Sequence, residues 1–147
     1  MKAVIQRVES ASVSVGGAEI ARIGAGLVVL LGVEKGDDEK DADFLLDKII
    51  HLRIFEDGEG KMNRSLADTA GELLVVSQFT LLADCRKGRR PSFTDAAEPA
   101  QAETLYRHVL SRAREKIPRV AAGQFQAMMK VALVNDGPVT ILLDSRR

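Results

Sequence analysis

The sequence holds few side chains of the kinds that enzymes use as bases or nucleophiles. Its 147 residues include two histidines, His51 and His108, and one cysteine, Cys85. Histidine is the usual general base, and a thiolate is the usual sulfur nucleophile. Both histidines fall within amphipathic helical patterns, and no histidine lies at a spacing from Cys85 that is typical of a catalytic pair. We therefore expect none of the three to do the chemistry.

Motifs for metals and nucleotides are also missing. The sequence has no zinc-ligand spacing, no GxGxxG, no P-loop and no HExxH. The short segment Gly24-Ala25-Gly26 lies between two strand-like segments and is typical of a turn. We accordingly expect no metal and no cofactor.

One unusual segment is Ser77-Gln78-Phe79-Thr80-Leu81, which follows the apolar run at 72–76. It is either the solvated end of a buried strand or one wall of a site that faces a substrate. A threonine hydroxyl needs an adjacent base before it can attack, and none is visible near Thr80. Backbone N–H groups that bind an oxyanion are therefore favoured here over Thr80 as a nucleophile.

A second unusual segment is LVNDGPVTILL at 133–143, where Asn135 to Pro138 interrupt a run of strand-forming residues. Asn-Asp-Gly-Pro suits a hairpin turn, and the residues alone favour that interpretation. The alternative is a rigid piece of backbone with a function of its own. Gly137-Pro138 is the kind of bond for which the cis form is accessible.

Composition narrows the class of protein. The 21 basic residues balance the 21 acidic ones, whereas a dedicated, sequence-blind nucleic-acid binder is usually basic. One local basic run, Arg86 to Arg90, is either a phosphate-binding segment or a solvated loop. No run of eighteen apolar residues predicts a membrane helix, and the N-terminus lacks the pattern of a signal peptide. A single cysteine permits no intrachain disulfide, so we expect a cytoplasmic protein.

Hydrophobic patterning predicts one α+β domain over 1–147. Residues 2–15 alternate as a strand, and glycine-containing turns follow it at 16–17 and 24–26. Tight turns require antiparallel pairing, so we expect a curved, mainly antiparallel sheet with helices against one side. The expected elements are strands at 2–15, 18–23, 27–33, 53–55, 72–79, 125–134 and 139–143, a helix capped by Asp37 with a stripe of Ala42, Leu45, Leu46 and Ile49, and a helix from Pro99 to Pro118.

The two unusual segments, SQFTLLAD (77–84) and NDGPVT (135–140), resemble the signature motifs of the D-aminoacyl-tRNA deacylases. The likeness extends to MKAVIQRV, IGAGLVVLLGVEKGD, RIFEDGEGKMNRS and GRRPSF, and so covers essentially the whole chain. It implies a barrel-like sheet with two or three helices and a homodimer with active sites at the subunit interface. The implied activity is hydrolysis of the ester in D-aminoacyl-tRNA, and in glycine mischarged on tRNA-Ala, with L-aminoacyl-tRNA rejected.

The resemblance also implies roles for particular residues. Gly137 and Pro138 would form a cis peptide that projects into the partner subunit and excludes L side chains. The opposite wall would be Ser77, Gln78, Phe79 and Thr80, with N–H groups near Phe79 and Thr80 on the carbonyl oxygen. The remaining substrate-binding candidates are Gln6, Arg7, which would orient the Gly-Pro loop, and Met129.

The family resemblance leaves two questions open. The group that drives hydrolysis is either a free hydroxyl of the substrate's ribose or the Thr80 hydroxyl. Two rival functions also stand beside the deacylase. One is a binding module that has kept the pocket and lost hydrolysis, and the other is a generic esterase for small D-amino acid esters.

Overall fold

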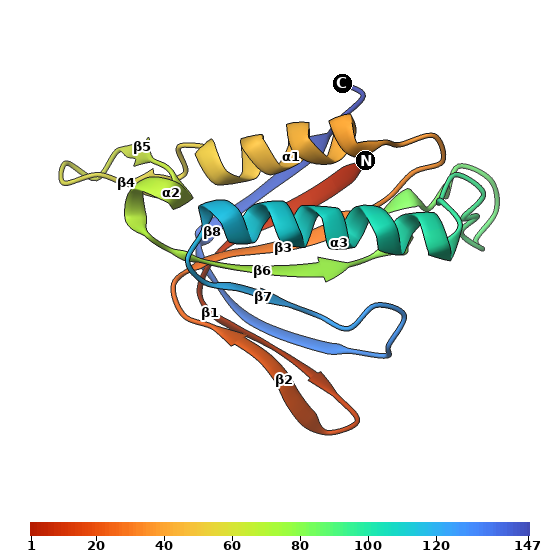
Figure 1. The fold of residues 1–147 in the computed structure, drawn as a ribbon, viewed down its shortest axis with the longest axis horizontal. Coiled ribbons are helices and arrows are strands. Elements are labelled where there is room, and N and C mark those ends of the chain that lie inside the picture. Colours follow the sequence, from red (N-terminus) through yellow and green to blue (C-terminus); the bar gives the residue numbers. More distant parts are fainter.

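A computed structural model describes all 147 residues, which form eight strands, three α-helices and one short 3₁₀-helix (Figure 1). The strands are β1 (Lys2–Val15), β2 (Ala18–Ile23), β3 (Gly26–Gly32), β4 (Phe55–Glu56), β5 (Met62–Arg64), β6 (Glu72–Ser77), β7 (Val120–Ala122) and β8 (Lys130–Asp144). The helices are α1 (Glu39–His51), α2 (Leu66–Thr69), η1 (Phe79–Leu82) and α3 (Pro99–Lys116).

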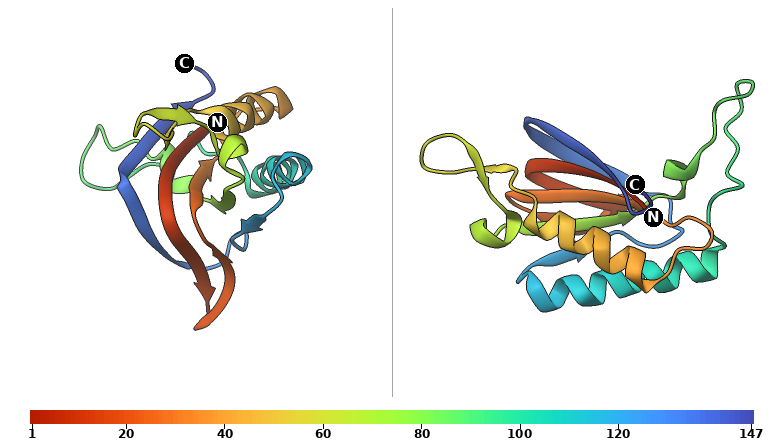
Figure 2. Two further views of the ribbon diagram at one scale, coloured as in Figure 1. Left: turned by 90° about the vertical axis from the view of Figure 1, so that its left-hand side faces the viewer. Right: turned by 90° about the horizontal axis from the view of Figure 1, so that it is seen from above.

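Strand β1 organises the sheet. It pairs antiparallel with β8 along nearly its whole length on one edge. On its other edge, the first half of β1 pairs with β3 and the second half pairs with β2. The sheet curves strongly into a nearly closed barrel (Figure 2). The long first strand predicted from the alternation at 2–15 is confirmed.

The expectation of a mainly antiparallel sheet is partly wrong, because the sheet is mixed. Strand β3 pairs parallel with β6, and β6 pairs parallel with β7. The chain between β3 and β6 contains α1, and the chain between β6 and β7 contains α3. A helical crossover brings the chain back to the end of the sheet at which the previous strand began. The next strand then runs in the same direction, so the two strands are parallel. In this sheet, the tight turns on which the expectation rests join only β1, β2 and β3.

Helices α1 and α3 lie side by side over one face of the sheet (Figures 1 and 2). Their apolar stripes pack with Ala3, Ile5, Leu27, Leu31 and Leu73 into the larger of two buried clusters. The smaller cluster lies on the other face and includes Val8, Val13, Val28, Leu74 and Val76. Strands β3 and β6 contribute to both clusters, and this explains their unbroken apolar sequences.

Two local predictions are corrected. Asp38, not Asp37, caps α1 and forms a capping box with Asp41. The Asp37 side chain is fully buried, where it pairs with the Met1 ammonium at 2.8 Å and with Arg146 at 3.1 Å. A carboxylate with two cationic partners tolerates burial, so Asp37 holds the two ends of the chain together.

The second correction concerns the end of the chain. A strand was expected at 125–134, but β7 is short and ends at Ala122, and a turn follows it before β8 begins at Lys130. No helix combines the length and the apolar character needed to cross a membrane.

Candidate functional site

The Asn-Asp-Gly-Pro segment is not a hairpin turn. Strand β8 continues through it, and both halves of β8 pair with β1. Asn135 lies opposite Val8 and Thr140 lies opposite Gln6, so the four residues 136–139 face the single residue Arg7. We call these four residues the insertion loop. It is a large bulge in one strand, and such bulges commonly redirect backbone next to functional sites.

Side chains from both strands hold the insertion loop. The Asn135 amide donates to the carbonyls of Arg7 at 2.9 Å and Val139 at 3.0 Å, and so bridges the base of the loop. Arg7, only 6% exposed, donates from Nε to the Asp136 carbonyl at 3.1 Å and from Nη1 to the Ile54 carbonyl at 2.7 Å. Arg7 thus fixes the loop to the segment that follows α1.

The tip of the loop is exposed backbone. The peptide bond between Gly137 and Pro138 is cis, as the resemblance implies. Gly137 has φ +130°, and a Cβ there would lie 2.9 Å from Val139 Cγ2 and 3.1 Å from Arg7 Nη2. Both residues at the tip are exposed to solvent. The side chains of Arg7 and Asn135 donate to the carbonyls of Asp136 and Val139, which flank the tip. No side chain of the protein donates to the carbonyl oxygen of Gly137 or Pro138.

The second candidate segment begins where β6 ends at Ser77 and continues into η1. Gln78 anchors its N–H on the Leu31 carbonyl at 2.8 Å. The Phe79 ring is 57% exposed and meets Phe93 edge-on, with ring centroids 5.1 Å apart. Thr80 is exposed as well.

The backbone and the hydroxyl of this segment differ in what they can do. The N–H groups of Phe79 and Thr80 begin a 3₁₀-helix and donate to no group of the chain. The Thr80 hydroxyl has one partner, the Gln78 amide at 2.9 Å. An amide does not take up a proton at neutral pH, so the chain places no general base on Thr80.

The two histidines lie on α1 and α3, and their hydrogen bonds involve neither segment. His108 bonds Asp43 at 2.8 Å across the α1–α3 contact, and His51 bonds the Asp47 carbonyl at 3.0 Å. Cys85 is exposed in the loop after η1. No group of three His, Cys, Asp or Glu side chains is arranged to hold a metal ion.

The other two residues singled out from the sequence flank the segments. Gln6 donates to the Thr140 hydroxyl at 3.2 Å, directly beside the insertion loop. Met129 precedes β8 instead of lying within a strand, and packs against the smaller cluster that contains Val76. A Cβ added to Gly123 would lie only 2.7 Å from the Met129 sulfur.

The two candidate segments do not meet within one chain. In the register of the sheet, Ser77 lies opposite Leu31, which lies opposite Ala3. The insertion loop lies opposite Arg7, four residues further along β1. Four residues along a strand span about 13 Å and the three strand spacings from β8 to β6 span about 14 Å, so the segments lie roughly 20 Å apart over the sheet surface. One small substrate cannot contact both in a single chain.

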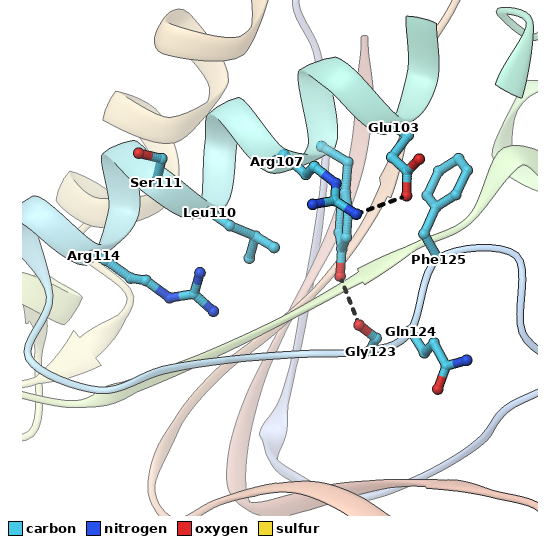
Figure 3. A pocket seen from close by; sticks show the side chains of 9 residues that line it. Glu103, Arg107, Leu110, Ser111, Arg114, Gly123, Gln124 and Phe125 are labelled. Carbon is cyan, nitrogen blue, oxygen red and sulfur yellow. Dashed lines mark hydrogen bonds and ion pairs between the residues drawn. The ribbon is translucent and has the colours of Figure 1, made fainter. Parts of the chain in front are cut away.

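A surface pocket lies away from both segments. Its volume is about 590 Å³, and it lies between α3 and the turn after β7 (Figure 3). Tyr106 donates into its wall, to the carbonyls of Val75 and Gly123, and burial raises the pKa of Tyr106 to about 12. Arg107 is held by Glu103 at 3.2 Å. Tyr106 and Arg107 therefore already have partners within the chain.

Fold and site together define a class of protein: a barrel-like α+β domain whose candidate site is built from exposed backbone instead of acid–base side chains. A family model described as D-Tyr-tRNA(Tyr) deacylase matches residues 4–144. The chain belongs to this family. Membership makes the protein an enzyme, a carboxylic ester hydrolase of the D-aminoacyl-tRNA deacylase type.

Individual relatives agree with this assignment. A D-aminoacyl-tRNA deacylase of Syntrophus aciditrophicus is 65% identical over 147 residues, which cover 100% of this chain and 99% of that protein. One from Dehalococcoides mccartyi is 60% identical over 146 residues, covering 99% and 95%.

Two solved structures have the same fold. The structure named c-Myc DNA Unwinding Element Binding Protein is 45% identical, with a TM-score of 0.93 over 98% of both chains. A probable eukaryotic D-amino acid tRNA deacylase is 17% identical, with a TM-score of 0.81 over 97% of both chains. The second likeness concerns the fold alone.

Sequence reasoning missed Asn135, which it treated only as a turn residue. Its side chain is the group that closes the base of the insertion loop. Asn-Asp-Gly-Pro is equally typical of an ordinary turn, and the distinguishing fact is the pairing of both flanking segments with β1, which no local signal gives.

We expect Asn135→Ala to lower the free energy of unfolding by about 1–3 kcal/mol, because the carbonyls of Arg7 and Val139 would lose their shared donor. Chemical denaturation of the variant measures this. Asn63→Ala is the matched control, since Asn63 bonds Asp57 on the exposed surface, and its effect should stay within about 0.5 kcal/mol. Equal effects of the two changes would contradict the anchoring role of Asn135.

Proposed function

We propose that this protein removes D-amino acids, and glycine mischarged on tRNA-Ala, from tRNA in the cytoplasm while it spares L-aminoacyl-tRNA. The observation that carries this proposal is the insertion loop, an exposed backbone tip fixed by Asn135 and Arg7. A rigid tip can reject substrates by shape. A flexible side chain in its place would move aside and admit an L residue.

A second copy of the chain would complete the site. The insertion loop and the Ser77–Thr80 segment are too far apart to act on one substrate within a chain. Strand β8 pairs only with β1, so its other edge is free along 15 residues, and free edges are usually covered. Large apolar side chains are exposed on or next to β8 and around η1: Phe79, Phe93, Met128, Val131, Val134 and Leu142. Such a surface is typical of a protein interface.

A groove beside β8 adds to this apolar surface. It has a volume of about 530 Å³ and brings together Val4, Phe44, Leu81 and Leu142 from β1, α1, η1 and β8. Leu142 is 74% exposed in the single chain. In the dimer that we propose, the insertion loop of each subunit enters the site of the other.

The loop tip would discriminate between the D and L forms of the aminoacyl substrate. The carbonyl oxygens of Gly137 and Pro138 receive no hydrogen bond from a side chain of the chain, and are suited to accept from the substrate's α-ammonium. With the ammonium and the ester both held, the side chain of an L substrate points into the tip and that of a D substrate points away. Glycine has no side chain to be excluded, so the same filter admits it.

Hydrolysis would depend on backbone donors and on the substrate. As water attacks the ester carbon, negative charge develops on the carbonyl oxygen, and the N–H groups of Phe79 and Thr80 are available to stabilise it. The free hydroxyl of the terminal ribose, next to the ester, orients and activates the water. The structure gives the Thr80 hydroxyl no base, which supports this route over a threonine nucleophile.

A nucleic-acid-binding protein without hydrolytic activity is the rival function, and the DNA-binding name of the 45% identical solved structure favours it. A generic esterase is the other alternative. We expect hydrolysis of D-Tyr-tRNA, but not of L-Tyr-tRNA or D-tyrosine ethyl ester, as followed by release of the free amino acid or alcohol. Cleavage of all three substrates would point to the esterase, and cleavage of none would point to the binding protein.

We expect Thr80→Ala to keep kcat within about tenfold of the unchanged protein, because loss of a covalent nucleophile costs on the order of 10⁴-fold or more. The complementary substrate is a D-aminoacyl-tRNA that lacks the free ribose hydroxyl, and its hydrolysis should fall by roughly 10²-fold or more. Complete inactivity of a folded Thr80→Ala protein, with the altered substrate still cleaved, would establish Thr80 as the nucleophile.

Mixing two inactive variants tests the shared site. Phe79→Pro removes one proposed oxyanion donor, and proline is tolerated in the first helical turn. Gly137→Val places a branched side chain at φ +130° against Val139 and Arg7. After unfolding and refolding together, half of the dimers should be mixed, and each has one intact site. About one quarter of the original activity should therefore return.

Phe79→Leu is the control for loss of the ring, and should keep more activity than Phe79→Pro because its N–H is retained. Each variant is first checked for folding by circular dichroism. If the loop served its own chain, or if the protein were monomeric, mixing would restore nothing.

A further inference from the structure

Residues 83–95 form an arm that projects from the body of the molecule, next to η1 (Figure 2, right). The arm narrows where Asp84 and Ser92 pair through two backbone hydrogen bonds of 2.8 and 2.9 Å. Its tip is the basic run Arg86-Lys87-Gly88-Arg89-Arg90, in which Gly88 has φ +67°. Every residue of the run is exposed.

Both ends of the arm are fixed. Its outgoing side follows directly from η1, and the Ala83 N–H bonds the Thr80 carbonyl at 3.1 Å. On its returning side, the Asp95 carbonyl accepts from the Lys35 N–H at 2.9 Å, and the Ala97 N–H bonds the Val33 carbonyl at 3.0 Å. Phe93 on this side packs against Phe79. The base of the arm therefore has a defined position relative to the Phe79–Thr80 backbone, and the basic run extends from that base.

The cations of the arm differ in their partners. Arg86 turns back onto Asp84 with contacts of 2.6 and 2.8 Å, and these hydrogen bonds lower the pKa of Asp84 to about 2. Lys87, Arg89 and Arg90 form no ion pair and no side-chain hydrogen bond within the chain. One cation thus stabilises the base of the arm, and three are free at its tip.

Free cations at this position suit a polyanion that runs away from the site. The chain as a whole is neutral, so attraction for such a ligand has to be local. Resting on the proposed function, we infer that Lys87, Arg89 and Arg90 bind backbone phosphates of the tRNA acceptor end while the terminal ester lies at Phe79 and Thr80. The contact is electrostatic and independent of base sequence.

The inference separates two parts of the substrate, the reacting ester and the polynucleotide. The test variant is Lys87→Ala/Arg89→Ala/Arg90→Ala. The control, Arg112→Ala/Arg114→Ala/Lys116→Ala, removes equal charge from the C-terminal end of α3, at the opposite end of the molecule (Figure 1). Each protein is assayed with D-Tyr-tRNA and with D-tyrosyl-adenosine, which has the ester and ribose but no phosphate. Binding of uncharged tRNA is measured in parallel by fluorescence anisotropy over a range of salt concentrations.

We expect the arm variant to raise KM for D-Tyr-tRNA roughly tenfold near 0.1 M salt and to reduce the slope of log affinity against log salt by about 2–3. Its kcat, its rate with D-tyrosyl-adenosine and every parameter of the control variant should stay unchanged. Equal losses on both substrates, or no change on either, would overturn the inference. If the unchanged protein cleaved neither substrate, the proposed function would fail, and the salt slopes for uncharged tRNA alone would decide the role of the arm.

Discussion

The pairing of β1 with β8 is the constraint on which the rest of the structure depends. These two strands run together over nearly their whole lengths, and the register leaves four residues of β8 facing Arg7 alone. Those four residues have no ladder partner, so they must leave the sheet as a loop. Because β-sheet register determines which side chains are neighbours, the loop also has a defined position, with Arg7 beneath it and Asn135 across its base. A hairpin at the same sequence would have reversed the chain and left Arg7 without this role.

The candidate site has few acid–base side chains, and backbone groups stand in their place. Near the family motifs, the backbone offers N–H donors at the start of η1 and, at the loop tip, carbonyl oxygens that receive no side-chain hydrogen bond. Such groups can stabilise charge and can discriminate between substrates by shape, but they do not exchange protons at neutral pH. An ester with a hydroxyl on the adjacent carbon supplies what the protein lacks. The proposed route, in which the substrate takes part in its own cleavage, depends on this property of the ester.

Sequence patterns predicted what local physics determines. The alternation at 2–15, the apolar runs of β3 and β6 and the stripes of α1 and α3 each follow from the burial of one or both faces. Patterns failed where distant pairing decides. Parallel pairing of β6 with β3 depends on the helical crossover, and the continuity of β8 depends on β1. Asp37 was mistaken for a cap because its buried partners, the Met1 ammonium and Arg146, are remote in sequence. Ser77–Thr80 and Gly137–Pro138 are named by the family motifs, but their separation within one chain follows from the pairing of β8, β1, β3 and β6, which no local pattern gives.

In the proposed site, recognition by main-chain atoms determines which substitutions the activity tolerates. Every residue except proline carries the same N–H group, so most substitutions at Phe79 or Thr80 leave the donors in place. The vulnerable positions are instead those that shape the backbone, such as Gly137 with its positive φ and Asn135 with its bridging amide. Sequence drift in this protein should thus be permissive around the reacting atoms and strict at the supports of the loop, the reverse of the pattern in an enzyme that depends on a catalytic side chain.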